Sequence, residues 1–222
     1  MKSVSKLFNL HTHKYTNQEN IIELVNQYPW EFDEKIPFYS IGIHPWYINE
    51  ERLHVDLQII EQKLTLHNCL ALGECGLDKR IEIPLETQIN VFKAQIFLAE
   101  KCQKPLVLHC VAAFQEIIQI KKELNIKVPL IIHGFSKNEQ TAKQLLDNGF
   151  YLSFGKYLLR NPELKTVFQS VPNDRFFLET DTVEESLEEV YALAANYKNI
   201  EIEEIKEIVA SNFEKVFQLK LI

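Results

Sequence analysis

The sequence contains no long hydrophobic run. No apolar stretch in its 222 residues reaches the roughly 18 residues needed to span a membrane. The N-terminal segment, residues 1–9, holds two lysines and a short apolar piece, without the longer apolar core and small-residue cleavage site of a signal peptide. We therefore expect a cytoplasmic protein.

Cysteine is scarce, and no two cysteines have the C-x-x-C spacing of a zinc knuckle or redox motif. The four are Cys69, Cys75, Cys102 and Cys110. In a chain of this length we interpret them as reduced, small core residues.

Positive charge is also in deficit, because the formal net charge is -7. This excludes a protein that coats nucleic acid nonspecifically, since such a protein needs a basic surface. It does not exclude a substrate phosphate held by bound metal ions, each of which supplies strong local positive charge. The apolar fraction of 46% and aromatic fraction of 11% are typical of a globular protein.

Linkers, low-complexity segments and fixed-period repeats are absent, so we expect one domain over residues 1–222. Short β-branched runs alternate with longer amphipathic stretches. The short runs predict strands buried on both faces at Lys6–Asn9, Ile21–Asn26, Phe38–Ile43, Cys69–Gly73, Leu106–Leu108, Leu130–Ile132, Phe150–Phe154 and Arg175–Leu178. The amphipathic stretches predict helices at Glu51–Leu66, Leu85–Cys102, Phe114–Leu124, Glu139–Asn148, Pro162–Phe168, Leu187–Tyr197 and Ile202–Phe217.

Pro84 and Pro162 stand where a helix is expected to begin, and Asn148-Gly149 where one is expected to end. No helix is predicted between the second and third strands, so the second unit looks reduced. Eight strands alternating with helices predict a TIM-barrel-like (β/α)8 fold of the α/β class, slightly small for that class. The rival interpretation is an open doubly wound sheet.

Polar residues of the kinds that bind metals follow six of the eight expected strands. They are His11, His13, His44, Glu74, His109, His133 and Asp181. In a parallel barrel the carboxyl ends of all strands face one rim, where active sites are built. His54 and His67 fall instead in or beside an expected surface helix.

The spacing of His11-Thr12-His13 places two imidazoles on one face of an extended segment, where both can hold one ion. Glu74 has two oxygens and can bridge two ions. Asp181 can complete the first ion's shell and accept a proton, while His109 and His133 complete the second shell. Imidazole and carboxylate without thiolate suit Zn2+, Mn2+ or Mg2+.

Seven motifs, in order along nearly the whole chain, resemble the TatD family of metal-dependent deoxyribonucleases. They are Asn9-Leu-His-Thr-His13, Gly42-Ile-His-Pro-Trp46, Ala71-Leu-Gly-Glu-Cys-Gly-Leu-Asp78, the run Gln88…Phe92…Gln95…Leu98-Ala99, Leu108-His-Cys110, His133-Gly-Phe-Ser136 and Leu178-Glu-Thr-Asp181. The resemblance implies a TIM-barrel-like fold, phosphodiester hydrolysis, and metal-ligand roles for His11, His13, Glu74, His109, His133 and Asp181. It also implies that His44 contacts the substrate phosphate.

The sequence departs from the family pattern at Lys14, Val111, Gly134 and the segment Thr182-Val-Glu-Glu185. These departures touch substrate contacts and not the expected metal ligands. They leave metal binding intact and leave the choice of substrate open.

The resulting hypothesis is a TatD-like deoxyribonuclease that cleaves phosphodiester bonds of DNA, or of another phosphodiester, with two divalent ions. Asp181, Glu74 and His44 are its candidate catalytic residues. Trp46, Tyr47 and Phe135 either stack on a base or pack the loops. Glu179 either holds a ligating histidine or forms a structural ion pair. Lys79, Arg80, Lys156 and Arg160 either meet a nucleic-acid backbone or are solvated.

Two alternatives remain open. The first is a metal-dependent hydrolase of a small-molecule ester, lactone or amide. The second is a metal-binding interaction protein without turnover, in which the acidic stretches Glu184–Glu189 and Glu201–Glu207 form a partner surface. No obligate protein partner is evident.

Overall fold

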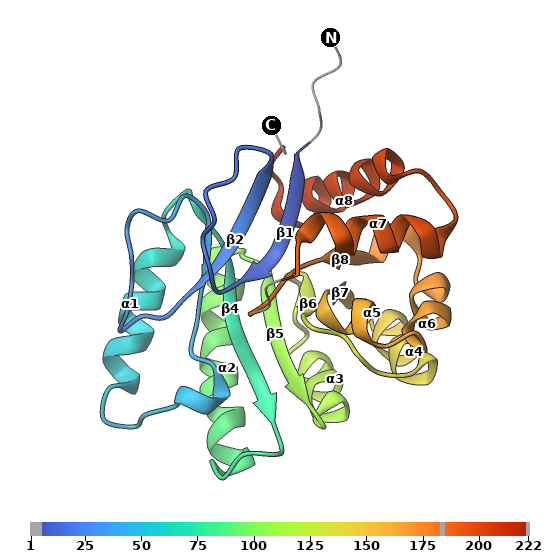
Figure 1. The fold of residues 1–222 in the computed structure, drawn as a ribbon. Helices are drawn as coiled ribbons and strands as arrows, with labels where there is room; N and C mark the ends of the chain where they lie inside the picture. The colour runs from blue at the N-terminus through green and yellow to red at the C-terminus, as the bar shows by residue number, and fades with distance from the viewer. Residues whose placement is uncertain (1–5, 183–184, 221–222) are drawn as a thin grey trace. The chain divides into compact units, whose positions relative to one another are not determined.

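The computed structural model describes residues 6–182 and 185–220, which form two compact units (Figure 1). Unit 1 comprises residues 6–24, 133–182 and 185–220, and unit 2 comprises residues 25–132. The expectation of a single domain over residues 1–222 stays a prediction.

Unit 2 is a parallel sheet with helices packed against it. Its strands, in spatial order, are the later part of β2 (Ile21–Gln27), β3 (Tyr39–Ile41), β4 (Cys69–Asp78), β5 (Leu106–Val111) and β6 (Leu130–Ile132). Its helices are η1 (Pro45–Tyr47), α1 (Leu53–Leu64), α2 (Leu85–Cys102) and α3 (Phe114–Glu123). All ten residues of β4 are buried, so this strand is the centre of the unit.

Helix α2 covers β4 with one apolar face (Figure 1). Val91, Phe92, Ile96 and Ala99 recur at helical spacing and are buried, which provides the hydrophobic stripe that a helix on a sheet requires. Pro84 caps the amino end, where its missing N–H costs no intrahelical hydrogen bond.

Unit 1 contains the remaining elements. They are β1 (Leu7–Thr12), the first part of β2, α4 (Glu139–Asp147), β7 (Tyr151–Phe154), α5 (Lys156–Arg160), α6 (Leu164–Ser170), η2 (Asn173–Arg175), β8 (Phe176–Leu178), α7 (Leu187–Lys198) and α8 (Ile202–Phe217). Strands β7 and β8 are parallel, and a parallel bridge joins Thr12 at the end of β1 to Asp181 beyond β8.

The core of unit 1 is aromatic. Phe8 on β1 packs edge-to-face against Phe177, Phe213 and Phe217, with ring centroids 4.6–6.0 Å apart. The hydroxyl of Tyr191 on α7 accepts a hydrogen bond from the Phe8 N–H and donates one to the Phe8 carbonyl. These contacts fix α7 and α8 against the strand that carries His11.

All eight expected strands are present, and the segment between β2 and β3 contains no helix, as predicted. Several local expectations were wrong. Strands β1, β4 and β5 run to Thr12, Asp78 and Val111, beyond the ends expected for them. The short helix α5 was not foreseen, and α6 begins at Leu164 and not at Pro162. Asn148-Gly149 ends α4 as expected, with Gly149 at a φ of +78°.

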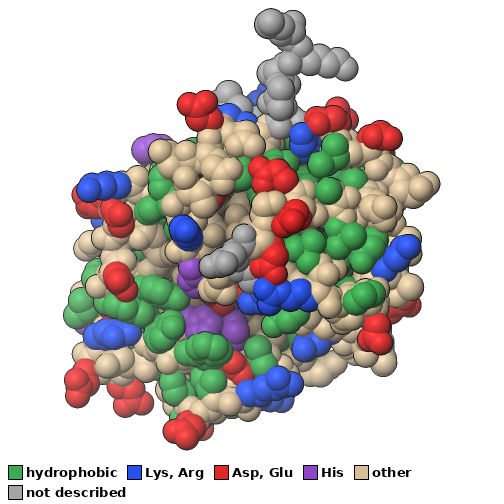
Figure 2. All heavy atoms as spheres, in the orientation of Figure 1, with side chains coloured by type: hydrophobic (Ala, Val, Ile, Leu, Met, Phe, Trp, Pro, Cys, Tyr) green, Lys and Arg blue, Asp and Glu red, His purple; other side chains and the backbone are tan. Residues whose placement is uncertain are grey.

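The face drawn in Figure 2 mixes both signs of charge, with basic side chains scattered among acidic ones. No described helix is both long and apolar enough to cross a membrane.

Candidate metal centre

Backbone hydrogen bonds between β1 and the segment after β8 bring the first group of candidate ligands together in unit 1. The Asp181 N–H donates to the His11 carbonyl (2.9 Å), and the His13 N–H donates to the Asp181 carbonyl (3.2 Å). The backbone of Asp181 is in the left-handed region, with a φ of +58°. The pairing sets the side chains of His11, His13 and Asp181 side by side.

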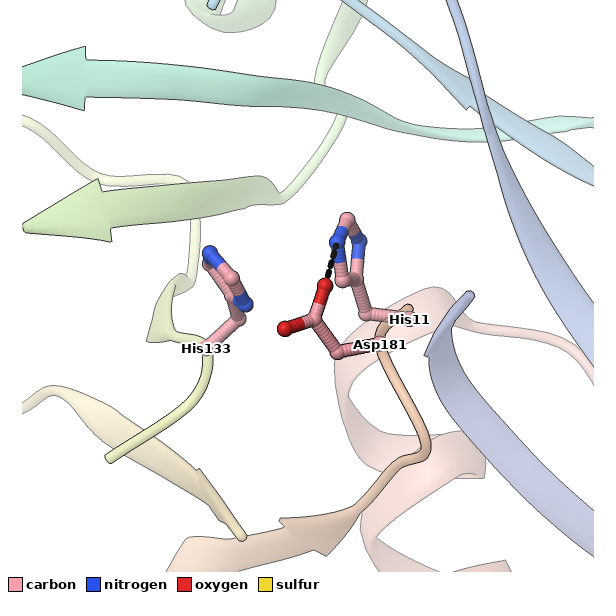
Figure 3. Close-up of side chains that lie close together, drawn as sticks. All are labelled: His11, His133 and Asp181. Atoms are coloured by element: carbon pink, nitrogen blue, oxygen red, sulfur yellow. Dashed lines mark ion pairs between the residues drawn. The ribbon is translucent and has the colours of Figure 1, made fainter. Parts of the chain in front are cut away.

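One carboxylate oxygen of Asp181 faces both imidazoles. Its Oδ1 lies 3.8 Å from His11 Nε2 and 3.7 Å from His13 Nε2. The ring of His133, which directly follows β6, lies with its centroid 4.4 Å from that of His11 (Figure 3). One ligand atom each from His11, His133 and Asp181 lies within 4.8 Å of the others, close enough to hold one cation.

The other oxygen of Asp181 accepts a hydrogen bond from Lys156 Nζ at 2.7 Å. Burial raises the pKa of Asp181, but the nearby His11 and His133 and the hydrogen bond from Lys156 outweigh burial and bring that pKa below its usual value. Asp181 is therefore an anion suited to binding a cation.

The carboxylate of Glu179 lies beside the ring of His133. Its Oε1 lies 3.4 Å from His133 Nδ1 and accepts a hydrogen bond from the Gly134 N–H at 2.8 Å. The side chain is fully buried, and a Cβ at Gly155 would lie 2.7 Å from the Glu179 carbonyl oxygen. Glu179 is thus placed to orient the ring of His133.

The second group lies in unit 2, around Glu74 on β4. Glu74 Oε1 lies 3.2 Å from His44 Nε2 and 3.0 Å from His109 Nδ1. The Glu74 N–H donates to Asn26 Oδ1, which fixes the backbone that carries this carboxylate. Atoms of His44, Glu74 and His109 again lie within 4.8 Å of one another.

The tautomer of His44 follows from its hydrogen bonds. Its Nδ1 accepts the backbone N–H of Trp46 at 3.0 Å, so in the neutral ring Nε2 carries the proton. His44 is therefore a hydrogen-bond donor through Nε2, the nitrogen that lies 3.2 Å from Glu74 Oε1.

Sequence reasoning gave no separate role to Asp78, the last residue of β4, although it quoted the motif that contains it. Asp78 Oδ2 accepts from Trp46 Nε1 at 2.8 Å and lies 3.3 Å from His109 Nε2. Burial raises the pKa of Asp78, but the hydrogen bonds from Trp46 and the Arg80 N–H and the nearby His109 lower it below its usual value.

His11, Glu74 and His109 lie within β1, β4 and β5, and not beyond the strand ends as expected. Of the two interpretations of Phe135, the structure favours packing, because this ring is 1% exposed and packs against Phe154. Trp46, by contrast, is 54% exposed.

The expected basic residues are largely engaged in ion pairs. Lys79 pairs with Glu116, Arg160 with Glu185, and Lys156 with Asp181. The acidic stretch expected at Glu184–Glu189 begins outside the described residues, and α7 starts at Leu187.

Both groups offer imidazole nitrogens and carboxylate oxygens, with no cysteine among them. This donor set fits a divalent ion such as Zn2+, Mn2+ or Mg2+. The hypothesis that Glu74 bridges two ions stays a prediction.

Comparison with known proteins places these groups in a family context. A family model described as TatD related DNase matches residues 1–218. YabD, an uncharacterised metal-dependent hydrolase of Bacillus subtilis, is 28% identical over 200 residues, which cover 82% of this chain and 78% of YabD. YcfH, an uncharacterised metal-dependent hydrolase of Escherichia coli, is 27% identical over 198 residues, covering 82% and 74%.

The crystal structure of YJJV, a TatD homologue from Escherichia coli, matches with a TM-score of 0.82 at 19% identity. The match covers 96% of this chain and 98% of that chain. Together with the parallel strand order, it confirms the TIM-barrel-like fold and removes the open doubly wound alternative.

Proposed function

This chain belongs to the family of TatD-related DNases and is a metal-dependent hydrolase, and we propose that it cleaves phosphodiester bonds of DNA with two divalent ions. One observation carries the proposal: each unit gathers imidazoles around a buried or half-buried carboxylate, Asp181 in unit 1 and Glu74 in unit 2.

We assign His11, His13, His133 and Asp181 of unit 1, and Glu74 and His109 of unit 2, as metal ligands. A divalent ion bound there supplies Lewis-acid polarisation of phosphoryl oxygens and makes a water molecule more acidic. A site of this kind needs no redox-active or thiolate ligand, which agrees with the donors present.

The protein's own groups divide the remaining work. Asp181, ionised at neutral pH, accepts the proton of the attacking water. His44 carries its proton on Nε2, because its Nδ1 accepts the Trp46 N–H. This proton faces Glu74 Oε1 at 3.2 Å, and we assign it to a non-bridging phosphate oxygen when substrate is bound. The exposed ring of Trp46 provides a face on which a base stacks.

The alternative substrate is a small-molecule ester, lactone or amide. The net charge of -7 favours it, since an acidic surface repels a polyanion such as DNA. For DNA to bind, the positive charge of the bound metal ions must outweigh this repulsion near the site.

A substrate panel tests the proposal. Protein freed of metal with a chelator is supplied with Zn2+, Mn2+ or Mg2+ and assayed on labelled DNA, a simple phosphodiester, a lactone and an amide. We expect DNA cleavage that needs the ion and is abolished in Glu74→Ala and Asp181→Ala. We also expect Asp181→Asn to retain metal binding better than turnover. Turnover of the lactone or amide without DNA cleavage, or full activity of Asp181→Ala, would overturn it.

A further inference from the structure

We propose that Asp78 is a positioning residue that fixes the ring of His109 with Nδ1 toward Glu74 and also anchors the exposed Trp46. The inference rests on the proposed function in one respect, namely that it takes His109 as a metal ligand. It adds a group that acts through His109 and not on the substrate itself.

Asp78 is held rigidly before it contacts either ring. It is 2% exposed, and the buried Gln88 of α2 accepts the Asp78 N–H (2.8 Å) and donates to the Asp78 carbonyl (3.0 Å). The Arg80 N–H donates to Asp78 Oδ1 at 2.8 Å. Hydrogen bonds therefore hold the backbone N–H, the backbone carbonyl and Oδ1 of Asp78. Because these atoms are held, the direction in which Oδ2 points is also defined.

Asp78 Oδ2 lies beside the imidazole of His109. Carboxylates flank both nitrogens of His109, with Glu74 Oε1 3.0 Å from Nδ1 and Asp78 Oδ2 3.3 Å from Nε2. When Nδ1 serves as the ligand atom, Nε2 retains its proton and donates a hydrogen bond to Asp78 Oδ2. A carboxylate in this place orients a ligating histidine and raises its basicity.

The same oxygen accepts the indole N–H of Trp46, which is a donor only. The backbone N–H of Trp46 in turn donates to His44 Nδ1. Asp78 thus contacts His109 directly and reaches His44 through Trp46, so one buried carboxylate sets both imidazoles that face Glu74.

The test measures binding of Co2+, whose visible absorption reports on its ligands, to Asp78→Ala, Asp78→Asn and the unaltered protein. We expect Asp78→Ala to lose affinity by about 10- to 100-fold, the usual effect of removing such a partner, and to change the spectrum. Asp78→Asn keeps the shape and one acceptor oxygen, so we expect a smaller loss.

Asp56→Asn is the matched control. Asp56 is also a 2% exposed aspartate of unit 2, but its partner is Arg52 Nε at 2.8 Å. We expect its Co2+ affinity and spectrum to equal those of the unaltered protein. Circular dichroism confirms that each variant is folded.

Two failures are distinguishable. If the unaltered protein does not bind Co2+, the proposed metal-dependent site fails. If it binds Co2+ and both Asp78 variants match its affinity and spectrum, the metal site stands and the positioning role of Asp78 is overturned.

Discussion

The two carboxylate oxygens of Asp181 have different neighbours. Oδ1 faces the imidazoles of His11 and His13, whereas Oδ2 is hydrogen-bonded to the ammonium of Lys156, itself only 20% exposed. Burial lowers the pKa of Lys156, but its hydrogen bond to Asp181 and the charge of that carboxylate outweigh burial and raise it. A fixed positive charge therefore stands beside the carboxylate that is proposed to bind a cation.

We predict that Lys156→Met binds Zn2+ about tenfold more tightly than the unaltered protein, because the charge that repels the ion is gone. Isothermal titration calorimetry measures the change. Lys156→Arg, which keeps the charge, should stay near the original affinity. The control is Lys143→Met, since Lys143 is 75% exposed and pairs with Asp147 on α4. Weaker binding by Lys156→Met would show that the lysine mainly orients Asp181.

Residue types alone pointed to the candidate ligands but not to every neighbour. His and Glu stand out beside apolar runs, whereas Asp78 is followed by Lys79 and Arg80, so the sequence there resembles the start of a charged loop. The ring of Phe135 is buried for a geometric reason. Gly134, at a φ of +56°, turns the chain, and the Phe135 N–H bonds to the Ser153 carbonyl, so the ring enters the core.

Among the elements, strand β4 has the tightest packing against a neighbouring strand. Gly76 on this strand pairs with His109 on β5, has a φ of +138°, and lies so close that an added Cβ would overlap the His109 carbonyl oxygen. Glycine is required here both for its backbone conformation and for the close approach of the two strands that carry Glu74 and His109.

We predict that Gly76→Ala lowers the free energy of unfolding by about 3 kcal/mol or more, because strain and overlap add. Gly149→Ala is the matched control, since Gly149 also has a positive φ but an added Cβ would meet no atom within 4 Å. It should cost only about 1 kcal/mol. Urea unfolding monitored by circular dichroism gives both values, and equal losses would contradict the role of the overlap.

The sequence located strands better than it located their ends. Apolar runs mark where β4 and β5 begin, but Glu74, Gly76 and Asp78 interrupt the apolar pattern although all three are buried in β4. Pairing with β5 continues the strand where composition alone suggests a loop. Helix α5 escaped prediction because its five residues are too few to show a helical period.

For the molecule as a whole, the order of the motifs carried the most information. Seven motifs in sequence over nearly all of the chain predicted the fold class that the comparison with YJJV confirms. Substrate choice was not accessible in the same way, because it depends on which loop side chains are exposed. Trp46 is exposed and Phe135 is not, and this difference is set by packing between distant residues.

Binding of a divalent ion should also raise the thermal stability of the folded chain. A divalent ion that binds only the folded protein adds about 2.7 kcal/mol when its free concentration is 100 times Kd, and in a chain of this size each kcal/mol raises Tm by about 2–4 °C. Chelator-treated protein should therefore gain about 5–11 °C in calorimetry when Zn2+ or Mn2+ is added. Asp181→Ala should gain less, whereas Asp147→Ala, which removes an exposed carboxylate of α4, should gain as much as the unaltered protein. A Tm that is the same with chelator and with excess ion would contradict metal binding by the folded chain.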